Sequence, residues 1–211
     1  MSQLPLNEIF ESIQGEGSFT GAPSIFVRLQ GCPVGCAWCD TKHSWYLDEA
    51  HQTSFDEVVA KGGDGESWCY TDIDEMVAHL LTYQARHIVI SGGEPCLYDL
   101  KDFCIALEAN GFSIQIETSG TFEVKVSDKT HVTVSPKVAM KGGYEILDSA
   151  LIRANEIKHP VAMSRHIEEL DALLARLTVD QRANKKVYLQ PISQQARATQ
   201  LAIDTCIERN W

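Results

Sequence analysis

Three cysteines stand within eight residues of one another near the start of the chain. Cys32, Cys36 and Cys39 are spaced C-x3-C-x2-C in the stretch GCPVGCAWCDTKHSW, residues 31–45. Thiolates are soft ligands that suit zinc or the iron of an iron–sulfur cluster. Three of them can hold three corners of a [4Fe–4S] cube, whereas clusters that only transfer electrons normally have four cysteine ligands. An open iron would mean that the cluster itself binds another molecule.

A zinc site is the alternative that the spacing leaves open. Tetrahedral zinc needs a fourth ligand, which His43, His51 or Cys69 could supply. The chain has seven cysteines, an odd number. In a cytosolic chain, clustered cysteines indicate metal binding or catalysis more often than disulfides.

The elements that must position this loop alternate between strands and helices. Apolar or alternating runs predict six strands, and amphipathic spacing predicts four helices. The predicted strands are 23–29, 87–91, 112–118, 131–135, 156–161 and 186–190, and the predicted helices are 71–85, a segment that ends at Gly111, 164–178 and 194–209. This order predicts an α/β fold with a mostly parallel six-stranded sheet, open or curled into a partial barrel. We expect residues 1–211 to form one domain, because no repeat or linker divides them, and residues 45–70 to be a surface insertion.

Polar and glycine-rich segments follow five of the predicted strands. They begin at Gly31, Ser91, Glu117, Ser135 and Gln190. Because ligands collect at the carboxyl ends of parallel strands, these segments predict one composite site. The Gly92-Gly93 turn would let the backbone approach a ligand closely, although a plain strand-to-helix turn would use the same residues.

Charge and hydropathy narrow the function class. The net charge of −11 argues against a nucleic-acid or anionic-membrane surface. No apolar run is long enough to span a membrane, and the first residues lack the pattern of a signal peptide. We therefore expect a cytoplasmic protein.

The cysteine loop after the first strand, followed one strand later by Gly-Gly-Glu-Pro (92–95), resembles the radical S-adenosylmethionine (SAM) superfamily. The resemblance implies the radical SAM fold, here as a partial (β/α)6-type barrel. It also implies that SAM binds the open iron through its methionine amino and carboxylate groups and that the reduced cluster cleaves it to a 5′-deoxyadenosyl radical.

A narrower resemblance covers nearly the whole chain. The segments NEIFESIQGEG (7–17), CDT (39–41), QIETSGT (115–121), TVSPK (133–137), ANEIKHPV (154–161) and LQPIS (189–193) are similar to the 7-carboxy-7-deazaguanine synthase family, especially its short-loop, enterobacterial-type members. That family converts 6-carboxy-5,6,7,8-tetrahydropterin into 7-carboxy-7-deazaguanine with loss of ammonia in queuosine and 7-deazapurine biosynthesis. Another small radical SAM enzyme, such as a glycyl-radical activase, and a non-catalytic zinc- or cluster-bearing scaffold remain alternatives.

The resemblance assigns a role to each matched residue. The cluster ligands are Cys32, Cys36 and Cys39, and Thr41 is the Mg²⁺ ligand. The substrate-binding residues are Ile13, Gln14, Gly15, Glu16, Arg28 and Ser91. The SAM-binding residues are Gly93, Glu117, Ser135, Pro136, Lys137, Gln190, Pro191, Ile192 and Ser193. Arg28 would pair with the substrate carboxylate, Glu16 with N–H donors of the pterin ring, Glu117 with the ribose hydroxyls and Lys137 with the SAM carboxylate.

The resemblance also implies partners, namely a flavodoxin-like electron donor and a second copy of the chain in a homodimer. His87, His131 and His159 are expected to be structural. Family members continue past the position of Trp211 with a strand that carries a histidine near the substrate. Either those residues lie outside this chain or substrate binding in it is weakened.

Overall fold

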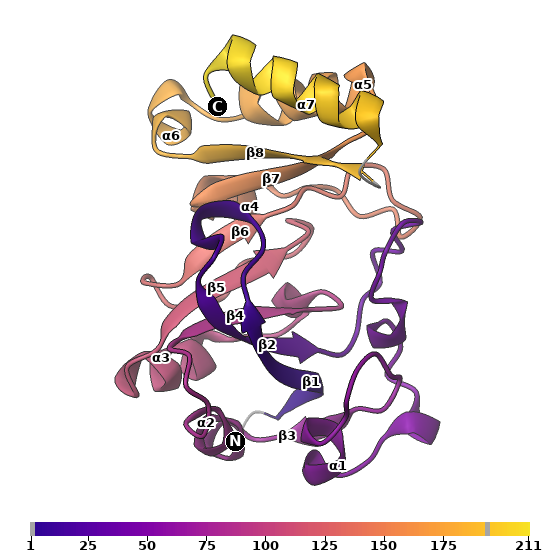
Figure 1. Ribbon diagram of the computed structural model, residues 1–211, viewed down its shortest axis with the longest axis vertical. Coiled ribbons are helices and arrows are strands. Elements are labelled where there is room, and N and C mark those ends of the chain that lie inside the picture. The colour runs from indigo at the N-terminus through magenta and orange to yellow at the C-terminus, as the bar shows by residue number, and fades with distance from the viewer. Residues whose placement is uncertain (1–2, 193–194) are drawn as a thin grey trace.

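The computed structural model describes residues 3–192 and 195–211. Within them, eight strands form one sheet in the order β3-β1-β2-β4-β5-β6-β7-β8 (Figure 1). The strands are β1 (Leu4–Ile13), β2 (Pro23–Leu29), β3 (Cys69–Thr71), β4 (His87–Gly92), β5 (Ser113–Thr118), β6 (His131–Val134), β7 (Glu156–Val161) and β8 (Lys186–Pro191). The helices are α1 (Phe55–Val59), α2 (Ile73–Leu80), α3 (Lys101–Ala109), α4 (Asp148–Arg153), α5 (Ser164–Ala175), α6 (Val179–Ala183) and α7 (Ala196–Arg209).

The six parallel strands β2, β4, β5, β6, β7 and β8 are the six that the sequence predicts. The predicted strand count is nevertheless too low, because β1 and β3 add an antiparallel edge beside β2. The first half of β1 is buried on both faces, including Asn7 and Glu8, so it shows no apolar–polar alternation. With three residues, β3 is too short to show a pattern.

Alternation along the parallel strands separates a hydrophobic core from a polar interior. In β5, Ile114 and Ile116 belong to the core cluster, while Gln115 and Glu117 point to the other face. The core side is covered by helices that pack on successive strands, with α3 against β5, α5 against β7 and α7 against β8 (Figure 1). The concave face of the sheet is thus left to polar side chains.

Polar contacts and one aromatic ring fill the lower part of this interior. Gln115 Nε2 donates to Thr133 Oγ1 at 2.9 Å, and Thr133 Oγ1 donates to Glu156 Oε1 at 2.8 Å. Below them, the ring of Phe19 stacks on His87 with a centroid separation of 4.1 Å. Phe19 ends the short 3-10 helix η1 (Gly17–Phe19), so the segment after β1 closes the floor of the partial barrel.

The predicted helices are present, with shifted ends. Asp72 caps α2 by accepting from Glu75 N at 2.9 Å, but the helix ends at Leu80 rather than at residue 85. The 45–70 segment is not only a surface insertion. It contains α1, and Val58 and Trp68 are buried in it.

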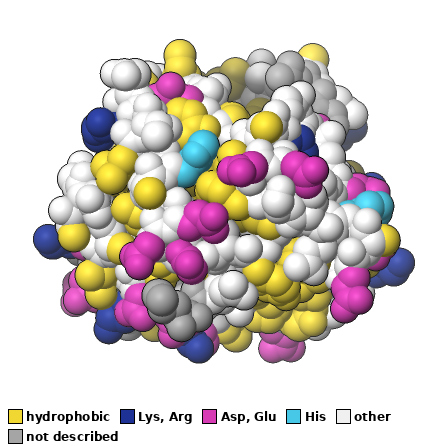
Figure 2. All heavy atoms as spheres, turned by 90° about the horizontal axis from the view of Figure 1, so that it is seen from below, with side chains coloured by type: hydrophobic (Ala, Val, Ile, Leu, Met, Phe, Trp, Pro, Cys, Tyr) yellow, Lys and Arg dark blue, Asp and Glu magenta, His cyan; other side chains and the backbone are white. Residues whose placement is uncertain are grey.

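The surface is acidic, as the net charge of −11 requires. Figure 2 shows Asp and Glu side chains over the middle of one face, with Lys and Arg mostly near its edges. Within the described part of the chain, no helix has the length and apolar character needed to cross a membrane.

Candidate active site

A cavity of about 780 Å³ opens at the carboxyl ends of the parallel strands. Most of the predicted site residues line it: Gln14, Gly15, Glu16, Arg28, Cys32, Cys36, Cys39, Thr41, Ser91, Gly93, Glu117, Ser135, Lys137, Gln190, Pro191 and Ile192. They come from the loop after β1 and from the ends of β2, β4, β5, β6 and β8. The structure therefore brings together segments that are distant in the sequence, as the rule for parallel sheets predicts.

Three predicted residues are not among those lining this cavity. The Ile13 side chain is 63% exposed, so it does not contact the cavity and only its backbone could serve there. Pro136 instead lines a small neighbouring hollow beside Trp38 and His159. Ser193 lies outside the described residues.

Backbone contacts fix the cysteine loop at the end of β2. Cys32 N donates to the Trp45 carbonyl at 2.9 Å, and the indole Nε1 of Trp45 donates to Cys39 Sγ at 3.3 Å. Cys39 Sγ also lies 3.5 Å from the Thr41 hydroxyl. Burial raises the pKa of Cys32 to about 11 and also raises the pKa of Cys36, which nearby Lys137 opposes. Buried thiols of this kind become good ligands only when a metal displaces their protons.

The spacing of the cysteines fits a cluster better than a single zinc ion. In the described ranges, no group of three His, Cys, Asp or Glu ligand atoms within 4.8 Å of one another includes these cysteines. Two thiolates on one tetrahedral zinc, each about 2.3 Å from the metal, would lie only about 3.8 Å apart. The three predicted fourth zinc ligands have other surroundings, since Cys69 is buried in β3, His51 faces Asp48 and Glu66, and His43 faces Asp64.

Gly92 and Gly93 are required by close backbone packing. A Cβ atom on Gly93 would lie 2.1 Å from the Gly31 carbonyl oxygen, and one on Gly92 would lie 2.3 Å from the Leu29 carbonyl oxygen. Gly92 also has a positive φ of 138°. The turn after β4 therefore lies directly against the start of the cysteine loop.

Glu94, to which sequence reasoning assigned no role, anchors that turn to the end of β5. Its buried carboxylate accepts from Thr118 Oγ1 at 2.6 Å, from Ser119 N at 2.8 Å and from Cys96 N at 2.9 Å. The Ser119 hydroxyl donates to it as well. Four donors satisfy most of the acceptor capacity of a carboxylate, so Glu94 serves to join two strand ends.

Arg28 is held at the cavity wall by a carboxylate behind it. Its Nε lies 2.5 Å from Glu8 Oε1, and Glu8 is itself buried in β1. Ser91 is the residue paired with Arg28 on the neighbouring strand β4. Because Glu8 contacts only Nε, the two terminal NH₂ groups of the Arg28 guanidinium remain available to a ligand in the cavity.

The far wall carries two lysines. Lys137 Nζ donates to Ser135 Oγ at 2.7 Å, and burial lowers the pKa of Lys137. Lys158, which sequence reasoning missed, is buried on β7 and lies 2.5 Å from Glu16 Oε2 and 2.7 Å from Glu117 Oε2. Lys158 and Glu156 are two residues apart on β7 and so share one face of the strand, but the sequence alone does not show the partners of Lys158.

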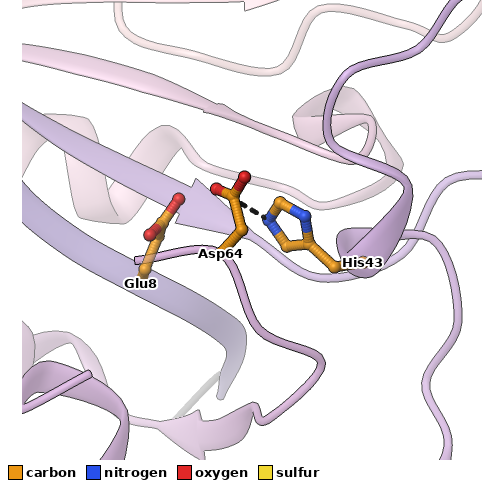
Figure 3. A group of neighbouring side chains, drawn as sticks. All are labelled: Glu8, His43 and Asp64. Atoms are coloured by element: carbon orange, nitrogen blue, oxygen red, sulfur yellow. Dashed lines mark ion pairs between the residues drawn. The ribbon is translucent and has the colours of Figure 1, made fainter. Parts of the chain in front are cut away.

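A second group of titratable side chains lies behind Arg28, at the base of the 45–70 segment. One ligand atom each from Glu8, His43 and Asp64 lie within 4.8 Å of one another (Figure 3). Arg28 already pairs with Glu8, and burial lowers the pKa of Lys61 while the nearby Glu8 opposes that change. The charges of Arg28 and Lys61 balance those of Glu8 and Asp64, so the group does not need a metal ion for charge neutrality.

Residues 26–132 match the family model of the Radical SAM superfamily, and the cysteine loop, the Gly-Gly turn and the parallel half-barrel are what that class requires. Members of this class use a [4Fe–4S] cluster and SAM. The chain is 56% identical over 211 residues to the 7-carboxy-7-deazaguanine synthase of Escherichia coli K12, covering 99% of this chain and 94% of that protein. The chain belongs to the 7-carboxy-7-deazaguanine synthase family.

Further relatives and one solved structure agree with this placement. The synthase of Buchnera aphidicola is 43% identical, with 98% of this chain and 93% of that protein covered. The synthase of Aquifex aeolicus is 34% identical over 95% of this chain and 83% of that protein. The crystal structure of QueE from Escherichia coli superimposes with a TM-score of 0.95 at 55% identity, covering 99% of this chain and 92% of that one.

Proposed function

We propose that this chain converts 6-carboxy-5,6,7,8-tetrahydropterin into 7-carboxy-7-deazaguanine and ammonia, in queuosine and 7-deazapurine biosynthesis. The observation that carries the proposal is that one cavity holds the cysteine loop, the Gly-Gly turn, Arg28 and Glu16. The substrate and the two products balance, because the deazaguanine differs from the tetrahydropterin by one molecule of ammonia. The glycyl-radical activase and the non-catalytic scaffold are not favoured, since the relatives matched over most of their length are named as synthases.

The cysteine loop supplies the radical chemistry. Cys32, Cys36 and Cys39 would hold the [4Fe–4S] cluster, to which SAM would bind. When bound, the cluster and SAM provide a 5′-deoxyadenosyl radical that takes a hydrogen from the substrate, and SAM is regenerated. The chain's own residues orient the two ligands and exclude water between them.

Arg28 recognises the substrate carboxylate. Its Nε is committed to Glu8 at 2.5 Å, which aims the remaining planar donors at the cavity. A bidentate pair with a carboxylate fixes orientation as well as binding energy. The hydroxyl of Ser91, on the adjacent strand, adds a contact next to it.

The loop after β1 recognises the pterin ring. Gln14 and Glu16 present amide and carboxylate groups that suit the alternating donors and acceptors of a pterin edge, and Gly15 and the backbone of Ile13 complete the loop. Thr41 binds Mg²⁺ together with oxygens of the substrate, because Mg²⁺ accepts few protein ligands. The Thr41 hydroxyl lies 3.5 Å from Cys39 Sγ, which supports an Mg²⁺ site beside the cluster.

Residues at the ends of β4, β5, β6 and β8 would hold SAM. Gly93 approaches its methionine group, Lys137 pairs with its carboxylate and Glu117 accepts from its ribose hydroxyls. Ser135, Gln190, Pro191 and Ile192 would form the rest of this wall, and the resemblance adds Pro136 and Ser193 to the SAM-binding residues. Of these, Pro136 lines only the neighbouring hollow.

The proposal extends to the cellular setting. We propose a cytoplasmic homodimer that receives electrons from a flavodoxin-like donor, with residues 1–211 as one domain. The seven free cysteines are consistent with a reducing compartment. The single sheet that joins the described strands supports one domain.

The direct test is turnover by the anaerobically reconstituted protein with SAM, dithionite and 6-carboxy-5,6,7,8-tetrahydropterin. We expect 7-carboxy-7-deazaguanine and an equal amount of ammonia. Deoxyadenosine without deazaguanine would point to another radical SAM enzyme, and a colourless protein with one zinc per chain would refute the radical chemistry.

A further inference from the structure

Five side chains form one continuous polar chain across the cavity. Gln190 Nε2 donates to Glu16 Oε1 at 2.5 Å, and Lys158 Nζ binds Glu16 Oε2 at 2.5 Å. The same ammonium group binds Glu117 Oε2 at 2.7 Å, and Gln14 Nε2 donates to Glu117 Oε1 at 3.2 Å. We call the central part, from Glu16 through Lys158 to Glu117, the lysine bridge.

The lysine bridge joins side chains from three elements that lie far apart in the sequence. Glu16 lies on the loop after β1, Lys158 on β7 and Glu117 on β5. Lys158 and Glu16 are 142 residues apart in the sequence, and Lys158 and Glu117 are 41 apart. The ammonium group therefore places two carboxylates from different walls within two ion-pair lengths of each other.

Lys158 keeps its charge in this position. Its side chain is only 6% exposed, and burial alone would lower the pKa of Lys158. Glu117 and Glu16 more than offset this effect, so its pKa is raised. One cation between two carboxylates screens their repulsion, and each carboxylate also accepts from a glutamine amide, which fixes both of its oxygens.

We propose that Lys158 is a positioning residue that sets the distance between the two ligands of the reaction. This inference rests on the proposed function, in which Glu16 contacts the pterin and Glu117 contacts the ribose of SAM. The hydrogen transfer runs between the ribose 5′ carbon and the pterin, and such steps depend on a separation of about 3–3.5 Å between reacting atoms. A lysine that binds both carboxylates fixes that separation without touching the reacting atoms.

The first test removes the charge and keeps the length of the side chain. We expect Lys158→Met to retain the cluster and SAM binding, and to lower the ratio of deazaguanine formed to SAM consumed by about tenfold, as expected for the loss of geometry. The matched control is Lys129→Met, because Lys129 is exposed and away from the cavity. An unchanged ratio in Lys158→Met would overturn the proposal.

The second test needs no substrate. Without Lys158 the two carboxylates repel, so one of them binds a proton more tightly in the folded protein than in the unfolded chain. The folding stability of Lys158→Met, relative to the unsubstituted protein, should then decrease as pH rises from about 5 to 8. Adding Glu16→Gln to Lys158→Met should remove this pH dependence, because only one carboxylate of the pair remains. The thermal unfolding midpoint across this range is the measurement.

The two tests separate this inference from the proposed function. If the unsubstituted protein forms no deazaguanine, the proposed function is wrong, and so is the pterin role given to Glu16. If it does form deazaguanine, equal slopes in the single and the double variant would show that Lys158 does not hold the carboxylate pair, and the inference alone would be refuted.

Discussion

Arg28 divides its guanidinium group between two carboxylates, one in the protein and one in the proposed substrate. Glu8 takes the Nε donor from inside the sheet. Arg28 also lines the cavity, and the first cysteine of the loop, Cys32, is only four residues later in the chain. Substrate recognition and cluster binding therefore lie close together but use different groups.

We expect Arg28→Ala to weaken substrate binding and to spare the cluster. Loss of a charge-assisted pair with a carboxylate should raise the KM for the tetrahydropterin by about 10- to 100-fold. Iron content and steady-state kinetics check this prediction. Equal loss of iron and of substrate binding would show that Arg28 supports the cysteine loop instead.

Residue types identified the chemistry, but not all of the geometry. Cys32, Cys36 and Cys39 were predictable because their spacing is local. Glu94 and Lys158 were not, since their partners lie on other strands and an isolated Glu or Lys at a strand end has many possible roles. For Ile13, the resemblance assigns a position along the chain but not the direction of the side chain, and this residue is exposed.

At the scale of elements, the segment that follows β1 closes the partial barrel. It crosses from the antiparallel edge of the sheet to the opposite one, where Ser18 N donates to Glu156 Oε2 at 3.0 Å. Gly17 packs against the same carboxylate, and a Cβ atom there would lie 2.3 Å from Glu156 Oε1. Glu156 cannot move away easily, because it is fully buried and Thr133 also holds it.

This contact predicts a difference between two glycines in one turn. Gly17 and Gly21 both have positive φ, of 67° and 89°, but nothing lies within 4 Å of a Cβ atom on Gly21. We expect Gly21→Ala to lower the free energy of unfolding by about 1 kcal/mol, the backbone cost alone. Gly17→Ala should lower it by about 2–4 kcal/mol, because a steric clash is added.

Urea unfolding of the two variants measures both values. Equal losses would show that the loop moves freely away from Glu156 and does not close the barrel as described.

The parallel part of the sheet was predictable and its antiparallel edge was not. Runs such as HIVIS and KVYLQ carry strand signals that do not depend on distant partners. In β1, by contrast, buried Asn7 and Glu8 break the pattern, and only their partners Gln30 and Arg28 explain why they are buried.

At the scale of the whole molecule, stability depends on groups that are buried in one protonation state. The pKa of His159 is lowered to about 4, chiefly by burial and also by the nearby charges of His166 and Lys137. In the described part of the chain neither ring nitrogen of His159 has a hydrogen-bond partner. The folded protein therefore keeps this histidine neutral, while the unfolded chain protonates it near its ordinary pKa of about 6.5.

We expect this difference to lower the free energy of unfolding as the pH decreases. Above about pH 6.5, His159 does not lower the free energy of unfolding. Below that pH the loss of stability increases as the pH decreases, and it reaches about 3 kcal/mol at about pH 4. Glu156, whose pKa is lowered to about 2 by hydrogen bonds that outweigh its burial, adds a further loss only as pH falls below about 4.5. The free energy of unfolding of His159→Leu, measured from pH 7.5 to 4.5, should show a flatter slope than that of the unsubstituted protein.

A slope that is unchanged in His159→Leu would assign the acid sensitivity to other groups. The variant should not be less stable at pH 7.5 than the original, since it removes two unsatisfied buried nitrogens.

The proposed chemistry requires that three cysteines leave one iron of a cluster open for SAM. The most direct measurement is electron–nuclear double resonance on the reduced protein with SAM labelled by ¹⁵N in its amino group. We predict a ¹⁵N coupling to the cluster in the unsubstituted protein and in Cys206→Ala, and its absence in Cys36→Ala, which cannot hold the cube. A reduced cluster with no ¹⁵N coupling, or stoichiometric zinc in place of iron, would contradict the account.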